Sequence, residues 1–136
     1  MMLLLDSSAI AIMLKRRRDK AVEIVRSKTT LNLAYYELGN IIWRECVLRG
    51  QTTPEEAVSR AEEVAKIMEL MKIETVESSK DLREVMELST KLRITFYDGS
   101  YLYVARKKGL TLVTEDAELK EKAEKIKVKV TSVNQL

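Results

Sequence analysis

Short apolar runs alternate with longer segments of helical spacing along the chain, and this alternation restricts the fold more than any other feature. The runs at residues 3–5 and 111–114 are typical of short buried strands. Weaker strand patterns cover residues 29–30, 73–76 and 128–133. Strands separated by helices need crossover connections, which make neighbouring strands parallel and place helices on both faces of the sheet. We therefore predict an α/β fold, a three-layer α/β/α sandwich with a mostly parallel central sheet.

Capping residues mark where several of the helices begin. Thr53, with Pro54 and Glu56 after it, has the pattern of a capping box with proline at the first helical position, and Thr95 with Asp98 has a related pattern. Glycines mark two helix ends. The predicted helices cover residues 9–14, 21–26, 32–49 (closed by Gly50), 54–71, 78–92, 95–109 (closed by Gly109) and 116–124.

Composition excludes much chemistry. The chain has 136 residues, the length of one domain, and we treat residues 1–136 as a single domain. It has no histidine and one cysteine, which excludes Ser-His and Cys-His nucleophile pairs, histidine zinc sites and an internal disulfide. A net charge of +3, from 24 basic and 21 acidic residues, is too balanced to indicate nucleic-acid binding alone. The apolar start ends at residue 5, so we expect a cytoplasmic protein with no membrane partner.

Three of the five aspartates occupy equivalent kinds of place in the predicted fold. Asp6 directly follows the strand at residues 3–5, Asp116 lies two residues beyond Thr114, and Asp98 lies at the start of a helix. The carboxyl ends of parallel strands and the beginnings of the following helices share one edge of a sheet, where ligands bind. We therefore expect these three carboxylates to converge.

A fourth acid belongs with them for a different reason. Leu33, Ile41 and Leu48 form an apolar stripe on the predicted helix at residues 32–49, and Glu37 lies within this stripe. Asn40 is the other polar residue on that face. A glutamate on a buried stripe is costly unless it is paired or bound to something.

Each acid also has a simpler interpretation. Asp6 and Asp116 can cap the helices that follow them, Asp98 can be the capping-box acid of its helix, and Glu37 can form a salt bridge to another element. Capping does not explain why all four converge on one edge. Four carboxylates at close range repel one another unless a cation lies among them. Oxygen ligands without histidine or cysteine favour Mg²⁺ or Mn²⁺ over zinc.

Four short segments carry a family resemblance: Leu3-Leu4-Leu5-Asp6-Ser7-Ser8; Tyr36-Glu37; Tyr97-Asp98 with Tyr101 and Ala105 behind it; and Thr114-Glu115-Asp116-Ala117-Glu118-Leu119. In their order and separation they resemble the PIN domain, especially the VapC-type toxins of toxin–antitoxin pairs. The resemblance covers essentially the whole chain.

The resemblance implies a metal-dependent endoribonuclease acting on single-stranded RNA, with Mg²⁺ or Mn²⁺ as cofactor. Its catalytic residues and metal ligands would be Asp6, Glu37, Asp98 and Asp116. Ser7 and Thr114 match positions that brace the carboxylates through hydrogen bonds, and Asn40 is assigned with them as a supporting residue. The implied partners are an RNA substrate, single-stranded or structured, a cognate antitoxin and a second copy of the chain. Apolar surface on the helices predicted at residues 32–49 and 54–71 also favours a homodimer.

Other functions stay open at this point. A housekeeping RNA-processing nuclease of the same fold fits the same residues, and a non-catalytic binding domain of this fold would not need all four acids. A Mg²⁺-binding phosphoacceptor receiver domain predicts an adjacent acidic pair after the first strand, where this chain has Ser7 and Ser8 after Asp6. It also predicts a lysine after the last strand, whereas Lys129 lies within that strand pattern.

Two further features have two interpretations each. The basic run at residues 15–18 is either a solvated loop or a contact for RNA phosphates or for an acidic segment of a partner. The tyrosines are mostly core and rim residues, although one near the acids could stack on a base. They are Tyr35, Tyr36, Tyr97, Tyr101 and Tyr103.

Overall fold

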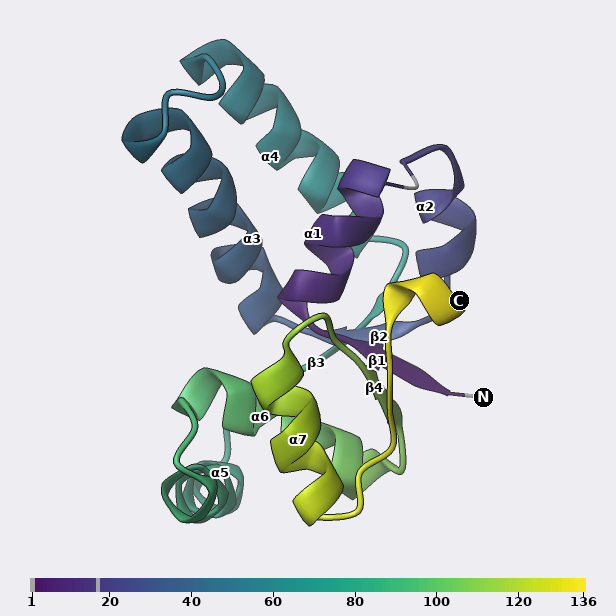
Figure 1. Cartoon of the computed structure of the whole chain (residues 1–136), viewed down its shortest axis with the longest axis vertical. Helices are drawn as coiled ribbons and strands as arrows, with labels where there is room; N and C mark the ends of the chain where they lie inside the picture. The colour runs from purple at the N-terminus through teal and green to yellow at the C-terminus, as the bar shows by residue number, and fades with distance from the viewer. Residues whose placement is uncertain (1, 17) are drawn as a thin grey trace.

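The strands form one five-stranded sheet in which every pair of neighbours is parallel (Figure 1). The computed structural model describes residues 2–16 and 18–136. The order across the sheet is β3-β2-β1-β4-β5. The central strand β1 pairs with β2 on one side and with β4 on the other. The strands are β1 (Leu3–Leu5), β2 (Thr29–Leu31), β3 (Lys72–Glu74), β4 (Thr111–Val113) and β5 (Val130–Thr131).

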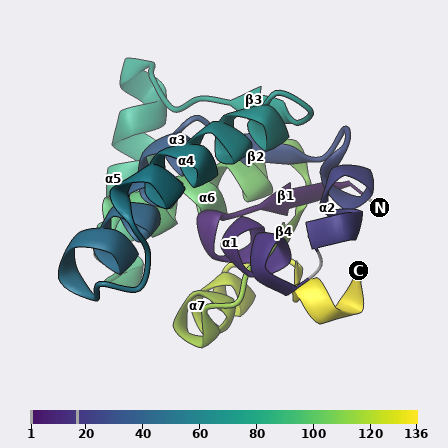
Figure 2. The ribbon, with the colours of Figure 1, turned by 90° about the horizontal axis from the view of Figure 1, so that it is seen from above.

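Helices cover both faces of the sheet, as Figures 1 and 2 show. One layer contains α1 (Ser7–Arg16), α2 (Arg18–Val25), α3 (Leu33–Trp43) and α4 (Pro54–Met68). The other contains α5 (Ser79–Leu92), α6 (Phe96–Lys108) and α7 (Ala117–Lys125). The alternation of strand side chains builds the two cores, because Leu3 and Leu5 pack with the first layer and Leu4 packs with the second. The predicted three-layer α/β/α sandwich is therefore confirmed.

The predicted helix starts at Thr53 and Thr95 are confirmed in detail. The Thr53 hydroxyl accepts a hydrogen bond from the N–H of Glu56 at 3.2 Å, and the Thr95 hydroxyl accepts one from the N–H of Asp98 at 3.0 Å. Helix α6 ends at Gly109, whose φ of 66° lies in the left-handed region. Helix α6 also lies very close to α5, since a Cβ atom on Gly99 would meet the Ser89 hydroxyl at 1.9 Å. The absence of a side chain at Gly99, next to Asp98, therefore lets the start of α6 pack closely against α5.

The predicted helix at residues 32–49 is present but does not keep α-helical geometry to its end. After α3 the backbone forms a π-helical turn, Arg44–Leu48, that ends at Arg49. This wider turn brings Glu45 into the interior, where only 5% of its surface is exposed. The spacing of apolar residues did not predict this change, because a single wider turn has no distinctive residue pattern of its own.

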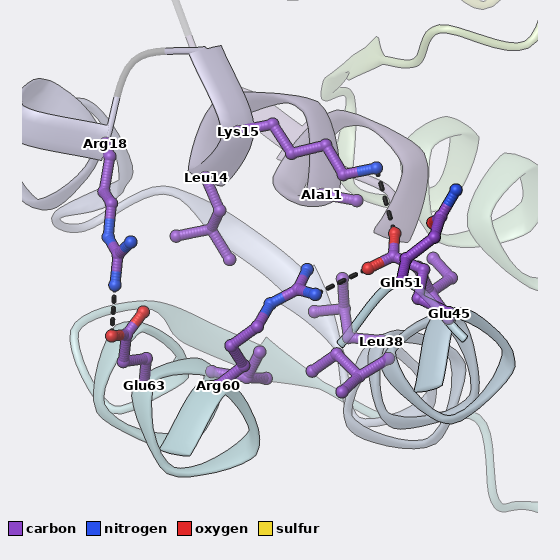
Figure 3. A pocket seen from close by; sticks show the side chains of 12 residues that line it. Ala11, Leu14, Lys15, Arg18, Leu38, Glu45, Gln51, Arg60 and Glu63 are labelled. Atoms are coloured by element: carbon purple, nitrogen blue, oxygen red, sulfur yellow. Dashed lines mark hydrogen bonds and ion pairs between the residues drawn. The ribbon is translucent and has the colours of Figure 1, made fainter. Parts of the chain in front are cut away.

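Figure 3 shows how the buried Glu45 is stabilised at a hollow of about 410 Å³ between α1, α4 and the π-turn. Its carboxylate contacts Lys15 Nζ at 3.0 Å and accepts a hydrogen bond from Arg60 at 2.5 Å. The hydrogen bond from Arg60 is the main reason why the pKa of Glu45 is lowered. Arg18 pairs with Glu63 across the same hollow. Two residues of the basic run therefore have acidic partners within the chain, and Arg17 lies outside the described residues.

The last predicted strand is shorter than its sequence pattern. Residues 128–133 were predicted as a strand, but β5 contains only two residues and is followed by a 3₁₀ turn, Val133–Gln135. The Ser132 and Gln135 side chains form a reciprocal capping box, which ends the strand. The strand predicted at residues 73–76 is also shorter and begins one residue earlier, at Lys72–Glu74.

Within the described residues, no helix combines the length and apolar character needed to cross a bilayer.

Candidate active site

The four predicted acids lie on the edge of the sheet where the parallel strands end. Asp6 follows β1, Asp116 follows β4, Asp98 lies in the first turn of α6, and Glu37 lies in α3. In Figure 1, the starts of α1 and α3 and the loop between β4 and α7 come together beside this edge. Parallel topology thus brings together side chains that are up to 110 residues apart in the sequence (116 − 6).

Asp6 is the most buried of the four acids, with 4% of its surface exposed. Its Oδ1 atom accepts hydrogen bonds from the Ser8 hydroxyl at 2.7 Å and from the N–H of Ala9 at 2.9 Å. Burial raises the pKa of Asp6, hydrogen bonds from Thr114, Ser8 and Ala9 partly offset this, and the charge of Asp116 raises it further. Asp6 is therefore both a cap for α1 and a carboxylate that feels a second carboxylate.

Ser8 and Thr114 connect the end of β1 to the loop after β4. The Ser8 hydroxyl lies 3.3 Å from the Thr114 hydroxyl and accepts a hydrogen bond from the N–H of Glu115 at 3.1 Å. Thr114 in turn accepts a hydrogen bond from the N–H of Asp116 at 3.1 Å. This chain of hydrogen bonds fixes the backbone of Asp116 relative to the end of β1, where Asp6 lies.

Asp116 caps α7, as the simpler interpretation proposed. Its Oδ1 atom accepts hydrogen bonds from the N–H groups of Glu118 at 2.9 Å and Leu119 at 3.2 Å. In both Asp6 and Asp116, the hydrogen bonds from the following helix go to Oδ1. The capping role therefore does not require Oδ2. A helix cap and a metal ligand are therefore compatible roles for the same carboxylate.

Glu37 of α3 is held by a buried tyrosine of α6, a helix of the opposite layer. The Tyr101 hydroxyl, on a side chain that is 1% exposed, donates a hydrogen bond of 2.9 Å to Glu37 Oε1. Burial raises the pKa of Glu37, the hydroxyls of Tyr101 and Ser7 lower it, and the charge of Asp6 raises it. Burial and the Glu37 charge also raise the pKa of Tyr101, which keeps its hydroxyl protonated as a donor.

Asp98 carries the clearest sign that the acids act on one another. Burial, followed by the charges of Asp116, Asp6 and Glu37, raises the pKa of Asp98 to about 6. All three of the other predicted acids therefore contribute to the electrostatic environment of this one carboxylate. In the capping-box interpretation the Asp98 carboxylate would bond back to the N–H of Thr95. The described residues show the bond from the Asp98 N–H to the Thr95 hydroxyl, and a hydrogen bond from the Thr95 side chain partly offsets the rise in the pKa of Asp98.

Within the described residues, none of the four acids forms an ion pair with a lysine or arginine. No three acidic or cysteine side chains of this part of the chain are already gathered at metal-binding distance. Neighbouring acids thus raise the pKa values of Asp6, Glu37 and Asp98, although no three of the described acids lie at metal-binding distance from one another. The set consists of oxygen donors with an unrelieved negative charge, and this chemistry fits a hard divalent cation.

The supporting residues differ in part from the predicted ones. Hydrogen bonds from Thr114 and Ser7 lower the pKa values of Asp6 and Glu37, respectively. The hydroxyl of Ser8, which was not predicted as a supporting residue, also donates to Asp6. Asn40 is exposed and lines a hollow with Glu37, and it makes no hydrogen bond to an acid within the described chain. The sequence does contain a signal for Ser8, because a serine two residues after a strand-end aspartate can bond back to it.

The family of the chain can now be stated. The sequence model of the PIN domain matches residues 3–125. The chain belongs to the PIN domain family. It is 32% identical to Ribonuclease VapC3 of Pyrobaculum aerophilum over 127 residues, which cover 90% of this chain and 95% of that protein. It is 34% identical to Exonuclease VapC9 of the same organism over 116 residues, 85% of this chain and 81% of the relative.

A solved structure extends the likeness to three dimensions. The crystal structure of PAE2754 from Pyrobaculum aerophilum superposes with a TM-score of 0.81 at 30% sequence identity, covering 98% of this chain and 90% of that one. The expected resemblance to VapC-type PIN proteins is therefore confirmed.

Proposed function

We propose that this PIN protein is a Mg²⁺- or Mn²⁺-dependent endoribonuclease that cleaves single-stranded RNA. The observation that carries the proposal is that four acids lie in or directly after elements meeting at one sheet edge and have no lysine or arginine partner in the described chain: Asp6, Glu37, Asp98 and Asp116. The raised pKa of Asp98 supports their proximity. A carboxylate cluster without a neutralising lysine or arginine in the described chain costs stability unless a cation is bound. The names of VapC3 and VapC9 support a nuclease activity.

The proposed ligands of the cation are Asp6, Glu37, Asp98 and Asp116. When bound, such an ion lowers the pKa of water and neutralises charge at a phosphodiester, which is the chemistry that hydrolysis requires. The residues of the chain fix the ligands in place: Tyr101 orients Glu37 through its hydroxyl, and Ser8 with the N–H of Ala9 orients Asp6.

The likeness to VapC proteins also supports a biological context. We propose that the chain is the toxin of a toxin–antitoxin pair, binds a cognate antitoxin protein and acts in the cytoplasm, where its RNA substrates are. A housekeeping RNA-processing nuclease is the alternative, and the two differ in whether expression arrests growth and a neighbouring gene relieves the arrest. A non-catalytic binding domain would not need all four acids, and the chain has Asp6, Glu37, Asp98 and Asp116.

The cut position also needs a test, because one relative is named a ribonuclease and another an exonuclease. We expect the purified protein to cut both a linear and a circular single-stranded RNA in Mg²⁺ or Mn²⁺ and to cut neither in chelator. A circular RNA has no ends, so its cleavage requires an endonuclease. Cleavage of only the linear RNA would make the protein an exonuclease, and inactivity on both with either metal would contradict the proposal.

The apolar residues left exposed by the fold predict a homodimer. Trp43, Val47 and Leu48, at the end of α3 and in the π-turn, are exposed, as is Val58 of α4. Burying such a surface against a second copy removes it from water. Light scattering at tens of micromolar should give about twice the 15.6 kDa chain mass, and a Val47→Glu variant should shift it toward the monomer. A monomeric mass for the parent would contradict the dimer.

A further inference from the structure

Two hollows share part of their lining, and one of the four carboxylates, that of Glu37, lines the first of them. The first, the acid-side hollow, has a volume of about 410 Å³, and its lining includes Ser7, Glu37 and Arg44. The second, the apolar hollow, has a volume of about 280 Å³, and its lining includes Leu31 and Phe96. Its size is just below the range for clefts that hold drug-sized ligands, about 300–1,000 Å³, and suits a smaller group. A ligand reaching from one to the other would pass the residues that line both, Leu33, Tyr36 and Tyr97.

Two tyrosines form the boundary between the hollows. Tyr36 and Tyr97 each line both hollows, and each directly precedes one of the four acids, Glu37 or Asp98. Their side chains are 73% and 58% exposed. The two helices that carry Glu37 and Asp98, α3 and α6, therefore also carry these two rings.

These tyrosines have no evident part in holding the fold together. The hydroxyl of Tyr101 donates to Glu37 and that of Tyr103 donates to Asp81, so both have structural partners. Tyr36 and Tyr97 make no side-chain hydrogen bond to another of the described residues. Exposed aromatic rings next to a reactive site are typical of surfaces that stack on unpaired bases.

We propose that the apolar hollow binds one unpaired nucleobase of the RNA, with Tyr36 and Tyr97 as specificity-determining residues that hold this base beside the phosphodiester to be cut. This inference rests on the proposed ribonuclease function and names the feature of the substrate that the site recognises: an unstacked base next to the scissile bond. A base paired within a duplex cannot enter the hollow, which accounts for the expected preference for single strands.

The charges around the two hollows assign each part of a nucleotide to one of them. No lysine or arginine of the described chain lines the apolar hollow, so its lining offers a phosphate no cation and accepts an uncharged base. Of its two glutamates, Glu74 is paired with Lys72 and Lys108, and Glu77 forms no ion pair with the described residues. Arg44 lines the acid-side hollow and forms no ion pair with the described residues. Its guanidinium is available for a backbone phosphate. The base thus lies on one side of the two tyrosines and the backbone on the other.

The test compares Tyr36→Ala and Tyr97→Ala with the parent. A pool of unstructured RNA is cut in Mg²⁺ or Mn²⁺, and sequencing of the new ends gives the base preference beside the cut. We expect a preference in the parent that both variants lose, with kcat/KM lowered by about 5- to 100-fold. Tyr36→Phe and Tyr97→Phe should retain the preference, because they keep the ring. Tyr35→Ala is the matched control, since Tyr35 is exposed on the same helix but lines neither hollow.

An abasic nucleotide at the preferred position separates base recognition from general damage. The parent should cut the abasic RNA more slowly than the intact RNA, whereas the two alanine variants should cut both RNAs at the same reduced rate. An alanine variant that still discriminates between the two RNAs as the parent does would overturn the proposal. An unchanged cleavage profile in both variants would also overturn it.

Binding distinguishes failure of this inference from failure of the ribonuclease proposal. Fluorescence anisotropy with a labelled single-stranded RNA is measured in an Asp98→Asn background, where cutting is not expected. If the parent cuts no RNA but binding still weakens on removal of Tyr36 or Tyr97, the base site stands and the ribonuclease proposal fails. If the parent cuts RNA and neither substitution changes binding, the base site fails alone. Light scattering is run on the same variants, and conversion of a dimer to a monomer would assign the two rings to an interface between copies.

Discussion

Replacing Asp98 by Asn should reduce RNA cleavage by at least about 100-fold while the fold is retained. Substituting a residue that only supports a metal ligand already costs 10- to 100-fold, and a ligand itself is expected to cost no less. The amide has nearly the shape of the carboxylate but cannot supply its negative charge. Initial rates on one single-stranded RNA in Mg²⁺ and in Mn²⁺ would be compared between the parent and the variant.

Asp19→Asn provides the matched control for this experiment. Asp19 lies in the first turn of α2, as Asp98 lies in the first turn of α6, but Asp19 is not one of the four converging acids. We expect Asp19→Asn to cleave at the parental rate. Equal cleavage by Asp98→Asn and the parent would remove Asp98 from the site, and equal losses in both variants would indicate a general effect of removing a helix-start charge.

The sequence predicts the position of the site better than its supporting contacts. Asp6, Asp98 and Asp116 could be located because a parallel sheet brings strand ends and helix starts to one edge, whatever the details of packing. The hydrogen bond from Ser8 to Asp6 was missed because a shift of one residue at a helix start decides which hydroxyl faces the aspartate, whereas Ser7 lies beside Glu37. The bond from Tyr101 to Glu37 joins residues 64 positions apart, and no local pattern contains it.

The fold shows the same division between local and distant causes. Thr53 and Thr95 were predicted as caps because each satisfies a backbone N–H within three residues. The π-turn after α3 could not be predicted in this way, because the burial of Glu45 depends on Lys15 of α1 and Arg60 of α4. The last strand ended early because the side chain of Gln135 competes for its backbone. Local patterns therefore predicted these helix starts, whereas the π-turn depends on partners distant in the sequence.

The cap and metal-site interpretations of Asp98 make opposite predictions for the stability of the metal-free protein. As a simple charge at a helix start, the carboxylate stabilises by about 0.3–1 kcal/mol, and Asp98→Asn should lower Tm. As a member of the cluster, its pKa of about 6 lies well above its ordinary value of 3.8, because burial and three like charges disfavour ionisation. Removing the charge should then raise Tm.

The pH dependence follows from the direction of this shift. Between pH 3.8 and 6 the folded state binds more protons at Asp98 than the unfolded state does, so stability falls as the pH rises through this window. The contribution of Asp98 to the stability of the folded state is therefore greatest below its unfolded pKa and is reduced at neutral pH. A full shift would correspond to about 1.4 kcal/mol of unfolding free energy for each pKa unit. Because Asp98 is only half buried and solvent screens its charge, we expect the loss of stability to be about 1–2 kcal/mol. The Asp98→Asn variant should lack this part of the pH dependence.

Melting curves in chelator and with added metal decide between the two interpretations. In chelator at neutral pH, Asp98→Asn should melt about 3–8 °C above the parent, and Asp19→Asn slightly below it. Metal at ten times its Kd should stabilise the parent by about 1.4 kcal/mol through binding to the folded state, and should stabilise Asp98→Asn much less. The order of the two Tm values should therefore approach equality or reverse when metal is added. A variant that melts below the parent in chelator, together with a parent that does not respond to Mg²⁺ or Mn²⁺, would mean that the carboxylates are helix caps only, and the proposed nuclease would lose its metal site.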